Sequence, residues 1–211
     1  MYQIKNPVAF HSVDMAILNE KNVLLAQKVK DAEAGDNLWR FPGGFIDVWD
    51  SCAEEAALRE AMEETGLRFG VDFISKYFEQ YFDKKKPLVK NLSELIKLSC
   101  DGIDGTGESI RSTIEHLQLI TPSEAALAWI RGNISYIGST KIDDVRYRDC
   151  DHKIITSFYE INCLVSGDVG EGPFDDIART KWFSFSEITE SIMHPAHKPL
   201  FKMLLDKYGK Q

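Results

Sequence analysis

The sequence is poor in cysteine and has no long apolar run. Its four cysteines, Cys52, Cys100, Cys150 and Cys163, lie far apart and form no C-x-x-C pair, so we expect neither a disulfide framework nor a zinc site. The start of the chain lacks the apolar core of a signal peptide, and no run approaches the length that crosses a membrane. These absences predict a cytoplasmic protein with reduced thiols and no membrane partner.

Basic residues are fewer than acidic ones. The 211 residues include 25 Lys and Arg against 33 Asp and Glu, a formal net charge of −8. Nucleic-acid binding needs a basic footprint, so we expect no nucleic-acid partner. An anionic small substrate is still compatible with this charge, because a bound divalent cation reverses the local field. The length and the 44% apolar content fit one compact domain, or one domain with a sizeable insertion.

Apolar patterns and turn residues predict an α/β fold. We expect strands at residues 8–18, 22–27, 72–82, 134–137, 153–164 and 181–185, and helices at 51–65, after 186 and from 199 onward. Pro42-Gly43-Gly44 predicts irregular backbone after a short apolar run. Residues at about 84–133 break the alternation and are interpreted as a mostly helical insertion. Mixed strands with helices on both sides indicate a sandwich.

The helix at residues 51–65 has the clearest signals. Ser51 and Glu54 fit a capping box, and Gly66 stands where a left-handed residue ends a helix. Glu60 and Glu64 share one face of this helix, and Glu63 lies one turn from Glu60. Three carboxylates so close repel one another unless a cation lies between them, and Mg²⁺ or Mn²⁺ prefers such oxygen ligands. A solvated acidic helix face is the alternative, and it is the commoner reading of an isolated E-x-x-E-E string.

Residues 44–67 resemble the Nudix box, G-x5-E-x7-R-E-U-x-E-E-x-G-U with U apolar. The second half matches at Arg59, Glu60, Ala61, Glu63, Glu64, Gly66 and Leu67. In the first half, eight residues rather than seven separate Asp50 from Arg59, and Ser51 occupies the glutamate position counted from Arg59. We interpret this as a one-residue insertion with Asp50 in the glutamate's place, which weakens the expectation of a contact between Arg59 and Asp50.

The resemblance implies a metal-dependent hydrolase of a nucleoside diphosphate linked to another moiety. It implies that Glu60 and Glu64 are the principal metal ligands and that the Gly43 carbonyl completes the shell. Glu63 is implied to support a second ion or to orient the water, and Arg59 to stiffen the junction of loop and helix. Metal ions in such sites bridge phosphate oxygens and lower the pKa of an attacking water.

Residues 136–156 are similar to the Nudix segment fused to nicotinamide-mononucleotide adenylyltransferases, which hydrolyses ADP-ribose. Within this segment, Arg146, Tyr147 and Arg148 suit a grip on a diphosphate and stacking on a base or ribose. A charged, exposed strand edge is the alternative.

Residues 174–182 are similar to the family's acidic loop before its last strand. Glu171, Asp175 and Asp176 are therefore candidates for the general base or a further metal ligand. Acids in Gly-rich loops are usually turn formers, and that reading stays open for each of them.

The residues before the Pro-Gly-Gly turn are further candidates for the substrate site. Arg40 could reach a phosphate or lie on the surface, and Trp39 and Phe41 could line a base pocket, although aromatics at such a place more often belong to the core. His194 and His197 have no third ligand nearby in sequence, so a zinc site is not expected.

The sequence thus predicts a single domain over residues 1–211, a Nudix-type α/β/α sandwich with a mixed sheet. We expect it to convert ADP-ribose to AMP and ribose 5-phosphate with Mg²⁺ or Mn²⁺, and two copies could pair as a homodimer. Other substrates stay open: NADH, another nucleoside diphosphate sugar, or an oxidised nucleoside triphosphate. A module that senses a nucleotide without catalysis is the remaining alternative.

Overall fold

The computed structural model describes seven stretches of the chain: residues 9–20, 22–28, 37–48, 50–67, 124–144, 153–162 and 177–209, without the side chains of 124–128. Contacts divide the chain into two units, Met1–Gly70 with Trp129–Gln211, and Val71–Ala128. The features that follow belong to the first unit, apart from the start of one helix. The expected strand at 72–82 and most of the expected insertion at 84–133 lie outside the described residues, so a single domain with an insertion stays a prediction.

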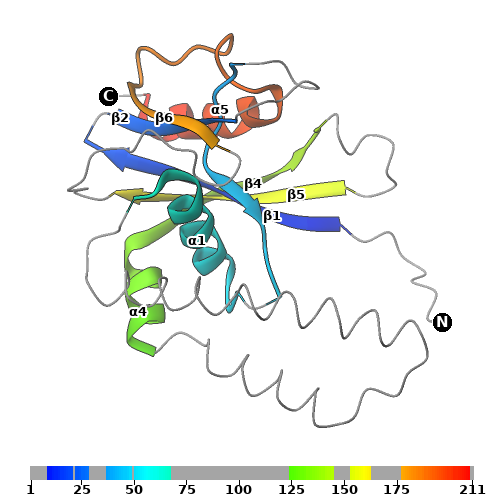
Figure 1. The fold of residues 1–211 in the computed structure, drawn as a ribbon, viewed down its shortest axis with the longest axis vertical. Coiled ribbons are helices and arrows are strands. Elements are labelled where there is room, and N and C mark those ends of the chain that lie inside the picture. Colours follow the sequence, from blue (N-terminus) through cyan, green and yellow to red (C-terminus); the bar gives the residue numbers. More distant parts are fainter. Residues whose placement is uncertain are drawn as a thin grey trace, which may run out of the picture. The chain divides into compact units, whose positions relative to one another are not determined.

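A mixed β-sheet forms the framework of the first unit (Figure 1). Its described strands are β1 (Ala9–Asn19), β2 (Asn22–Lys28), β3 (Gly43–Phe45), β4 (Ile134–Ile142), β5 (Lys153–Asn162) and β6 (Ile177–Ser184). They follow the order β4-β5-β1-β2-β6, with β3 paired to β1. Strands β1 and β5 run parallel, whereas the other pairs between the named strands are antiparallel.

Strand β1 separates two packing layers, because its side chains alternate between the faces of the sheet. Ala16 and Leu18 belong to a core cluster with Leu200 and Leu204 of helix α5 (Lys198–Tyr208). Ile17, between them, is equally buried and points to the opposite face, and helix α1 (Ala53–Thr65) packs against β1. A mixed sheet between helices confirms the expected α/β sandwich.

Three strands differ from the sequence prediction. The Pro-Gly-Gly segment was expected to be irregular, but Gly43–Phe45 form β3 and pair with Ser12–Asp14 of β1. Strands β4 and β6 extend beyond the predicted ranges, as Ile134–Ile142 and Ile177–Ser184. Both form the ends of the strand order, where pairing with β5 or β2 supplies hydrogen bonds that the local apolar pattern does not announce.

The start of α1 also differs from the expected capping box. Its N-cap residue is Cys52, whose side chain makes no capping hydrogen bond. The N–H of Ser51 donates to Glu55 Oε2 at 2.8 Å, so Glu55 is the acceptor in place of Glu54. The end of the helix is as predicted, since Gly66 has a φ of 66° and its N–H donates to the Met62 carbonyl.

The last part of the chain is helical, but less so than expected. The helix predicted after residue 186 is absent from residues 185–194, where turns form at 185–187 and 190–192, although Ser184 N–H donates to Glu187 Oε2 at 2.7 Å as a cap would. A short 3₁₀ segment, η2 (Pro195–His197), leads into α5. Helix α4 (Glu124–Asn133) precedes β4. Among the described helices, none has the length and apolar character needed to cross a membrane.

Candidate active site

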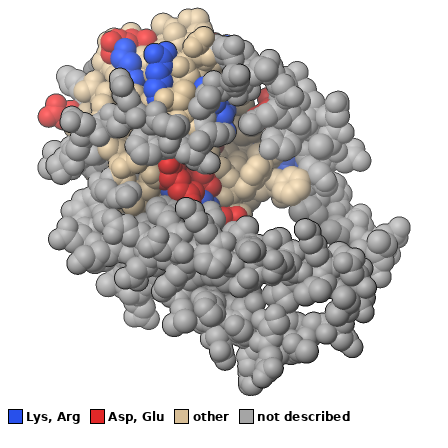
Figure 2. Space-filling view, in the orientation of Figure 1, with Lys and Arg blue, Asp and Glu red and all other residues tan. Residues whose placement is uncertain are grey.

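The guanidinium of Arg59 is the centre of the acidic cluster on α1. Its Nη1 donates to Glu60 Oε1 at 2.6 Å and to Glu63 Oε2 at 3.0 Å. The Arg59 side chain is 1% exposed, whereas those of Glu60 and Glu63 are 15% and 22% exposed. Figure 2 shows acidic side chains gathered over the region that α1 occupies in Figure 1. The two carboxylates therefore converge on one point that solvent reaches in part.

Asp50 completes this cluster, despite the one-residue insertion that argued against it. Arg59 Nε and Nη2 donate to the two oxygens of Asp50 at 3.0 and 2.8 Å, a bidentate ion pair. Asp50 Oδ2 also accepts from the N–H of Asp47 at 2.7 Å. This turn takes up the extra residue, so the weakened expectation of this contact was wrong. Burial lowers the pKa of Arg59, but the bonds to Asp50 and the charges of Glu60 and Glu63 outweigh burial and raise it above its usual value.

Two glycines bring the preceding strand against the acids of α1. The N–H of Gly43 donates to Glu64 Oε2 at 2.9 Å. At Gly44, a Cβ atom would lie 2.5 Å from Cδ of Glu60, and at Gly43 it would lie 2.2 Å from the carbonyl oxygen of Val13. A side chain at Gly43 would collide with the backbone of β1, whereas a side chain at Gly44 would displace the Glu60 carboxylate. Glu60 and Glu64 consequently both lie against the glycine pair Gly43-Gly44 at the start of β3, as their spacing on one helix face predicts.

These acids match a divalent cation in chemistry, although the described residues contain no preformed cage of three ligands. No group of three His, Cys, Asp or Glu in the described ranges is close enough to hold a metal ion. The groups available to a metal ion beside the glycine pair are nonetheless carboxylate oxygens, which Mg²⁺ and Mn²⁺ prefer. Glu60 and Glu63 already point at a single cationic nitrogen, Nη1 of Arg59. Glu60, Glu63 and Glu64 are the side chains that would hold the ion.

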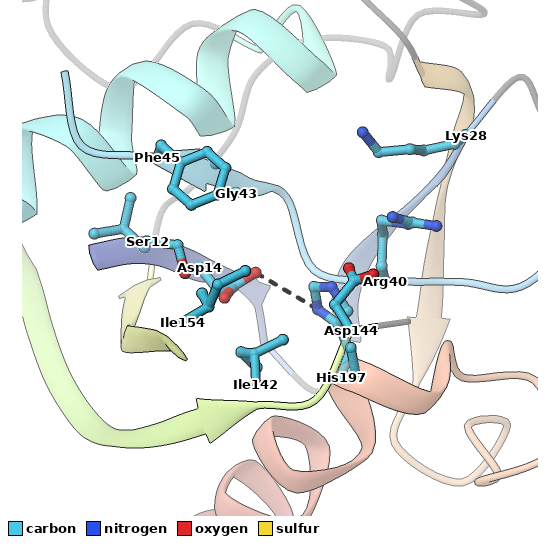
Figure 3. Close-up of a pocket in the computed structure, with 13 residues that line it drawn as sticks. Ser12, Asp14, Lys28, Arg40, Gly43, Phe45, Ile142, Asp144, Ile154 and His197 are labelled. Carbon is cyan, nitrogen blue, oxygen red and sulfur yellow. Dashed lines mark ion pairs between the residues drawn. The ribbon is translucent and has the colours of Figure 1, made fainter. Parts of the chain in front are cut away.

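A pocket of about 200 Å³ lies beside the glycine pair Gly43-Gly44 (Figure 3). Gly43, Gly44 and Phe45 of β3 form part of its wall, so it adjoins the acids of α1. Charged and titratable side chains line it as well: Asp14 from β1, Lys28 from β2, Arg40, Asp144 after β4, and His197 from η2. In Figure 3, the carboxylate of Asp14 and the ring of His197 face each other.

Asp14 is an acid of the pocket wall with a strongly perturbed pKa. Burial raises its pKa to about 7, against the opposing influence of a hydrogen bond from Thr156 and of the charge of Arg40. The hydroxyl of Thr156 donates to Asp14 Oδ2 at 2.5 Å, and His197 Nδ1 lies 3.5 Å from Asp14 Oδ1. Glu60 also raises the pKa of Asp14 through its charge, so the pocket wall and the acidic cluster interact electrostatically.

The structure places some of the predicted substrate residues and leaves others outside the described ranges. Arg40 lines the pocket and is buried, in keeping with a role near phosphate and contrary to a surface position. The prediction that Trp39 lines the substrate pocket was wrong. Trp39 packs in the core, edge-on to Phe183 with ring centroids 4.8 Å apart, and the Arg179 guanidinium lies over its ring. The other candidates lie outside the described residues, namely Arg146, Tyr147, Arg148, Glu171, Asp175 and Asp176.

Sequence reasoning missed four residues of the pocket wall: Asp14, Lys28, Asp144 and His197. Asp14 had a usable signal, because it is the one acid in residues 13–18 of β1, which are otherwise apolar and are all buried. His197 was considered only as a zinc ligand. Its neighbour His194 accepts a hydrogen bond from the N–H of Ala196 at 3.3 Å and caps η2, and this arrangement directs residue 197 to the pocket.

A family model described as the NUDIX domain matches residues 10–133. The putative 8-oxo-dGTP diphosphatase YtkD of Bacillus subtilis (strain 168) is 47% identical over 62 residues, which are 28% of this chain and 37% of that protein. Another putative 8-oxo-dGTP diphosphatase of that strain is 50% identical over 50 residues, 24% of this chain and 30% of the relative. The chain thus matches less than two fifths of the length of these curated relatives.

Solved structures share the fold at low sequence identity. The Nudix domain of Shewanella oneidensis NrtR, in complex with ADP-ribose, superposes with a TM-score of 0.53 at 16% identity, over 98% of this chain and 93% of that one. The Escherichia coli ORF135 protein gives a TM-score of 0.54 at 15% identity, over 97% and 94% of the two chains. These similarities support the α/β fold with its mixed sheet.

Proposed function

This chain belongs to the Nudix family, and we therefore propose that it is a pyrophosphohydrolase acting on a nucleoside diphosphate linked to another moiety. Its proposed substrate is ADP-ribose, with AMP and ribose 5-phosphate as products. Nudix hydrolases generally use divalent metals, and Mg²⁺ or Mn²⁺ is the proposed ion here. Action in the cytoplasm and pairing of two copies remain predictions.

The observation that carries the proposal is the position of Glu60 and Glu64 against the glycine pair Gly43-Gly44 beside the pocket. When bound, a divalent cation neutralises phosphate oxygens and lowers the pKa of an attacking water. Glu60, Glu63 and Glu64 would hold it, and Arg59 fixes the direction of two of these carboxylates.

Lys28 and Arg40 supply the positive charge for the diphosphate. Both line the pocket, as does the glycine pair Gly43-Gly44. The Arg40 guanidinium can bind phosphate oxygens in a bidentate manner, which fixes orientation, whereas the Lys28 ammonium acts as a point charge. A diphosphate that binds these cations would lie beside the acids of α1, where the bridging bond is to be cleaved.

Two similarities support ADP-ribose as the substrate. Residues 136–156 resemble the segment of the ADP-ribose-hydrolysing Nudix proteins. Most of the edge strand β4 belongs to that segment, and Ile142 at its end and Asp144 just after it line the pocket. The Shewanella Nudix domain with the same fold binds ADP-ribose. The polar side chains Asp14, Asp144 and His197 could receive the hydroxyl groups of a ribose.

An oxidised nucleoside triphosphate is the second candidate substrate. It is favoured by the two Bacillus relatives, whose names give 8-oxo-dGTP as their substrate and which are about half identical over short stretches. The acids of α1 carry no information on base or sugar, so both candidates use the same proposed chemistry.

A substrate panel tests the proposal. The purified chain is incubated with Mg²⁺ or Mn²⁺ and with ADP-ribose, NADH or 8-oxo-dGTP, and the products are measured by chromatography. We expect cleavage of ADP-ribose, and Glu64→Gln should lose most of that rate. Glu54→Gln is the matched control, because it makes the same change on the same helix at a residue outside the cluster.

The outcomes separate the alternatives. Preferential cleavage of 8-oxo-dGTP would replace ADP-ribose with the second candidate. Equal rates for Glu64→Gln and wild type would mean that the cluster is not the catalytic site. Tight ADP-ribose binding in calorimetry without turnover would support a sensor in place of an enzyme.

A further inference from the structure

Two exposed phenylalanines form an aromatic pair at the pocket. Phe45 lines the pocket and is 41% exposed, and Phe10 is 45% exposed. Their ring centroids lie 6.1 Å apart at an interplanar angle of 67°, an edge-to-face contact. Large exposed apolar side chains next to a polar pocket are typical of a binding surface, because water solvates them poorly.

The main chain of Phe45 is fixed relative to the acidic cluster. Arg59 Nη2 donates to the Phe45 carbonyl at 3.1 Å, and the same guanidinium binds Glu60 and Glu63 through Nη1. On the other side, Phe45 pairs with Ser12 of β1, and the N–H of Ile46 donates to the His11 carbonyl at 3.2 Å. The position of the Phe45 main chain relative to the proposed metal ligands is thereby fixed by hydrogen bonds on both sides.

We propose that Phe45, supported edge-on by Phe10, is the surface on which the base of the substrate stacks, and this rests on the proposed function. A diphosphate at the acids of α1 brings its nucleoside to the adjoining pocket, where two kinds of wall meet (Figure 3). The charged side chains suit sugar hydroxyls, whereas an aromatic ring suits the flat face of a base. Phe45 is thus a specificity-determining residue that favours nucleotides over phosphorylated sugars.

Calorimetry with the two expected products tests this role, with AMP carrying a base and ribose 5-phosphate lacking one. Phe45→Leu keeps an apolar side chain and removes the ring, and Phe45→Tyr restores the ring. We expect Phe45→Leu to weaken AMP binding about tenfold, which corresponds to about 1.4 kcal/mol, because the stacking of the base on the aromatic ring is lost. Ribose 5-phosphate binding should stay at the wild-type value, and Phe45→Tyr should bind AMP as wild type does.

Tyr136→Leu is the matched control. Tyr136 is also an exposed aromatic residue, and it forms an edge-to-face pair with Tyr159 whose ring centroids lie 5.6 Å apart. Unlike Phe45, it is not among the residues that line the pocket. It should leave AMP binding unchanged. Circular dichroism of each variant checks that the fold is retained.

Three results would overturn the proposal: unchanged AMP binding in Phe45→Leu, equal losses for AMP and ribose 5-phosphate, or no AMP binding by the wild type. The hydrolase proposal fails separately. If the wild type cleaves nothing in the substrate panel while Phe45→Leu still loses AMP selectively, the stacking role stands without the activity. If ADP-ribose is cleaved and Phe45→Leu has an unchanged KM, the activity stands without the stacking role.

Discussion

Replacing Arg59 with methionine should strongly destabilise the fold, because it leaves a buried carboxylate without its counter-ion. The side chains of Arg59 and Asp50 are 1% and 0% exposed and share two hydrogen bonds. Removing one partner of such a buried pair costs about 3–5 kcal/mol. Glu60 and Glu63 reach solvent in part and should add little, as exposed ion pairs contribute at most about 1 kcal/mol.

Urea denaturation followed by circular dichroism measures this loss for wild type and Arg59→Met. The matched control is Lys202→Met on α5, which removes a cation from an exposed pair with Asp206 at 3.7 Å, with side chains 76% and 68% exposed. We expect the control to change the free energy of unfolding by less than about 0.5 kcal/mol.

A loss below about 1 kcal/mol for Arg59→Met would refute this reasoning, since Arg59 would then behave like the exposed Lys202. A second variant, Asp50→Asn, keeps the volume and removes the negative charge. In combination with Arg59→Met it should recover part of the lost stability, because no charged carboxylate then stays buried without a partner. Purely additive losses would contradict the pairing of Asp50 with Arg59.

Three further predictions concern the pocket wall, the turn and the last helix. Burial raises the pKa of Asp14 to about 7, so the folded protein binds more protons than the unfolded chain, and stability should fall as the pH rises from about 4 to 7. Asp14→Asn should abolish this part of the pH dependence of stability. If the urea midpoint changes equally between pH 5 and pH 8 in wild type and in Asp14→Asn, the prediction is wrong. Gly43→Ala should lower the melting temperature, because its Cβ would meet the backbone of β1. Gly44→Ala should chiefly weaken Mn²⁺ binding, because its Cβ would displace the Glu60 carboxylate. A larger loss of melting temperature in Gly44→Ala and a larger loss of Mn²⁺ binding in Gly43→Ala would contradict this assignment. Glu160→Gln should speed hydrogen exchange in α5, since this carboxylate accepts from Lys207 at 2.7 Å and from Tyr208 at 2.8 Å; unchanged exchange would mean that these bonds do not hold the helix.

Local patterns predicted the helix that carries the acids. The spacing of Glu60, Glu63 and Glu64 and the glycine that ends α1 both act within one or two turns of chain, so neighbouring residues suffice to specify them. The core strands β1, β2 and β5 were likewise found from apolar runs, since their side chains are buried by the sheet and its helices.

Contacts between distant segments could not be read in the same way. The bidentate pair of Asp50 and Arg59 depends on how the loop after β3 bends, and the bond from Asp47 N–H to Asp50 determines that bend. Composition alone also could not assign the aromatics: Trp39 is core and Phe45 is exposed at the pocket, although both flank the same Pro-Gly-Gly segment.

The sequence by itself determined the chemical groups and their local spacing: an acidic helix, a pair of glycines before it and the class of sandwich. The tertiary structure decided which side chains share a pocket. Asp14, Asp144 and His197 come from three separate segments and meet because β1 lies between β3 and β5, with η2 close to Asp14. Spacing along the chain fixes neighbours within a helix or strand, but contacts between segments depend on sheet order and burial, which arise only when the whole chain packs.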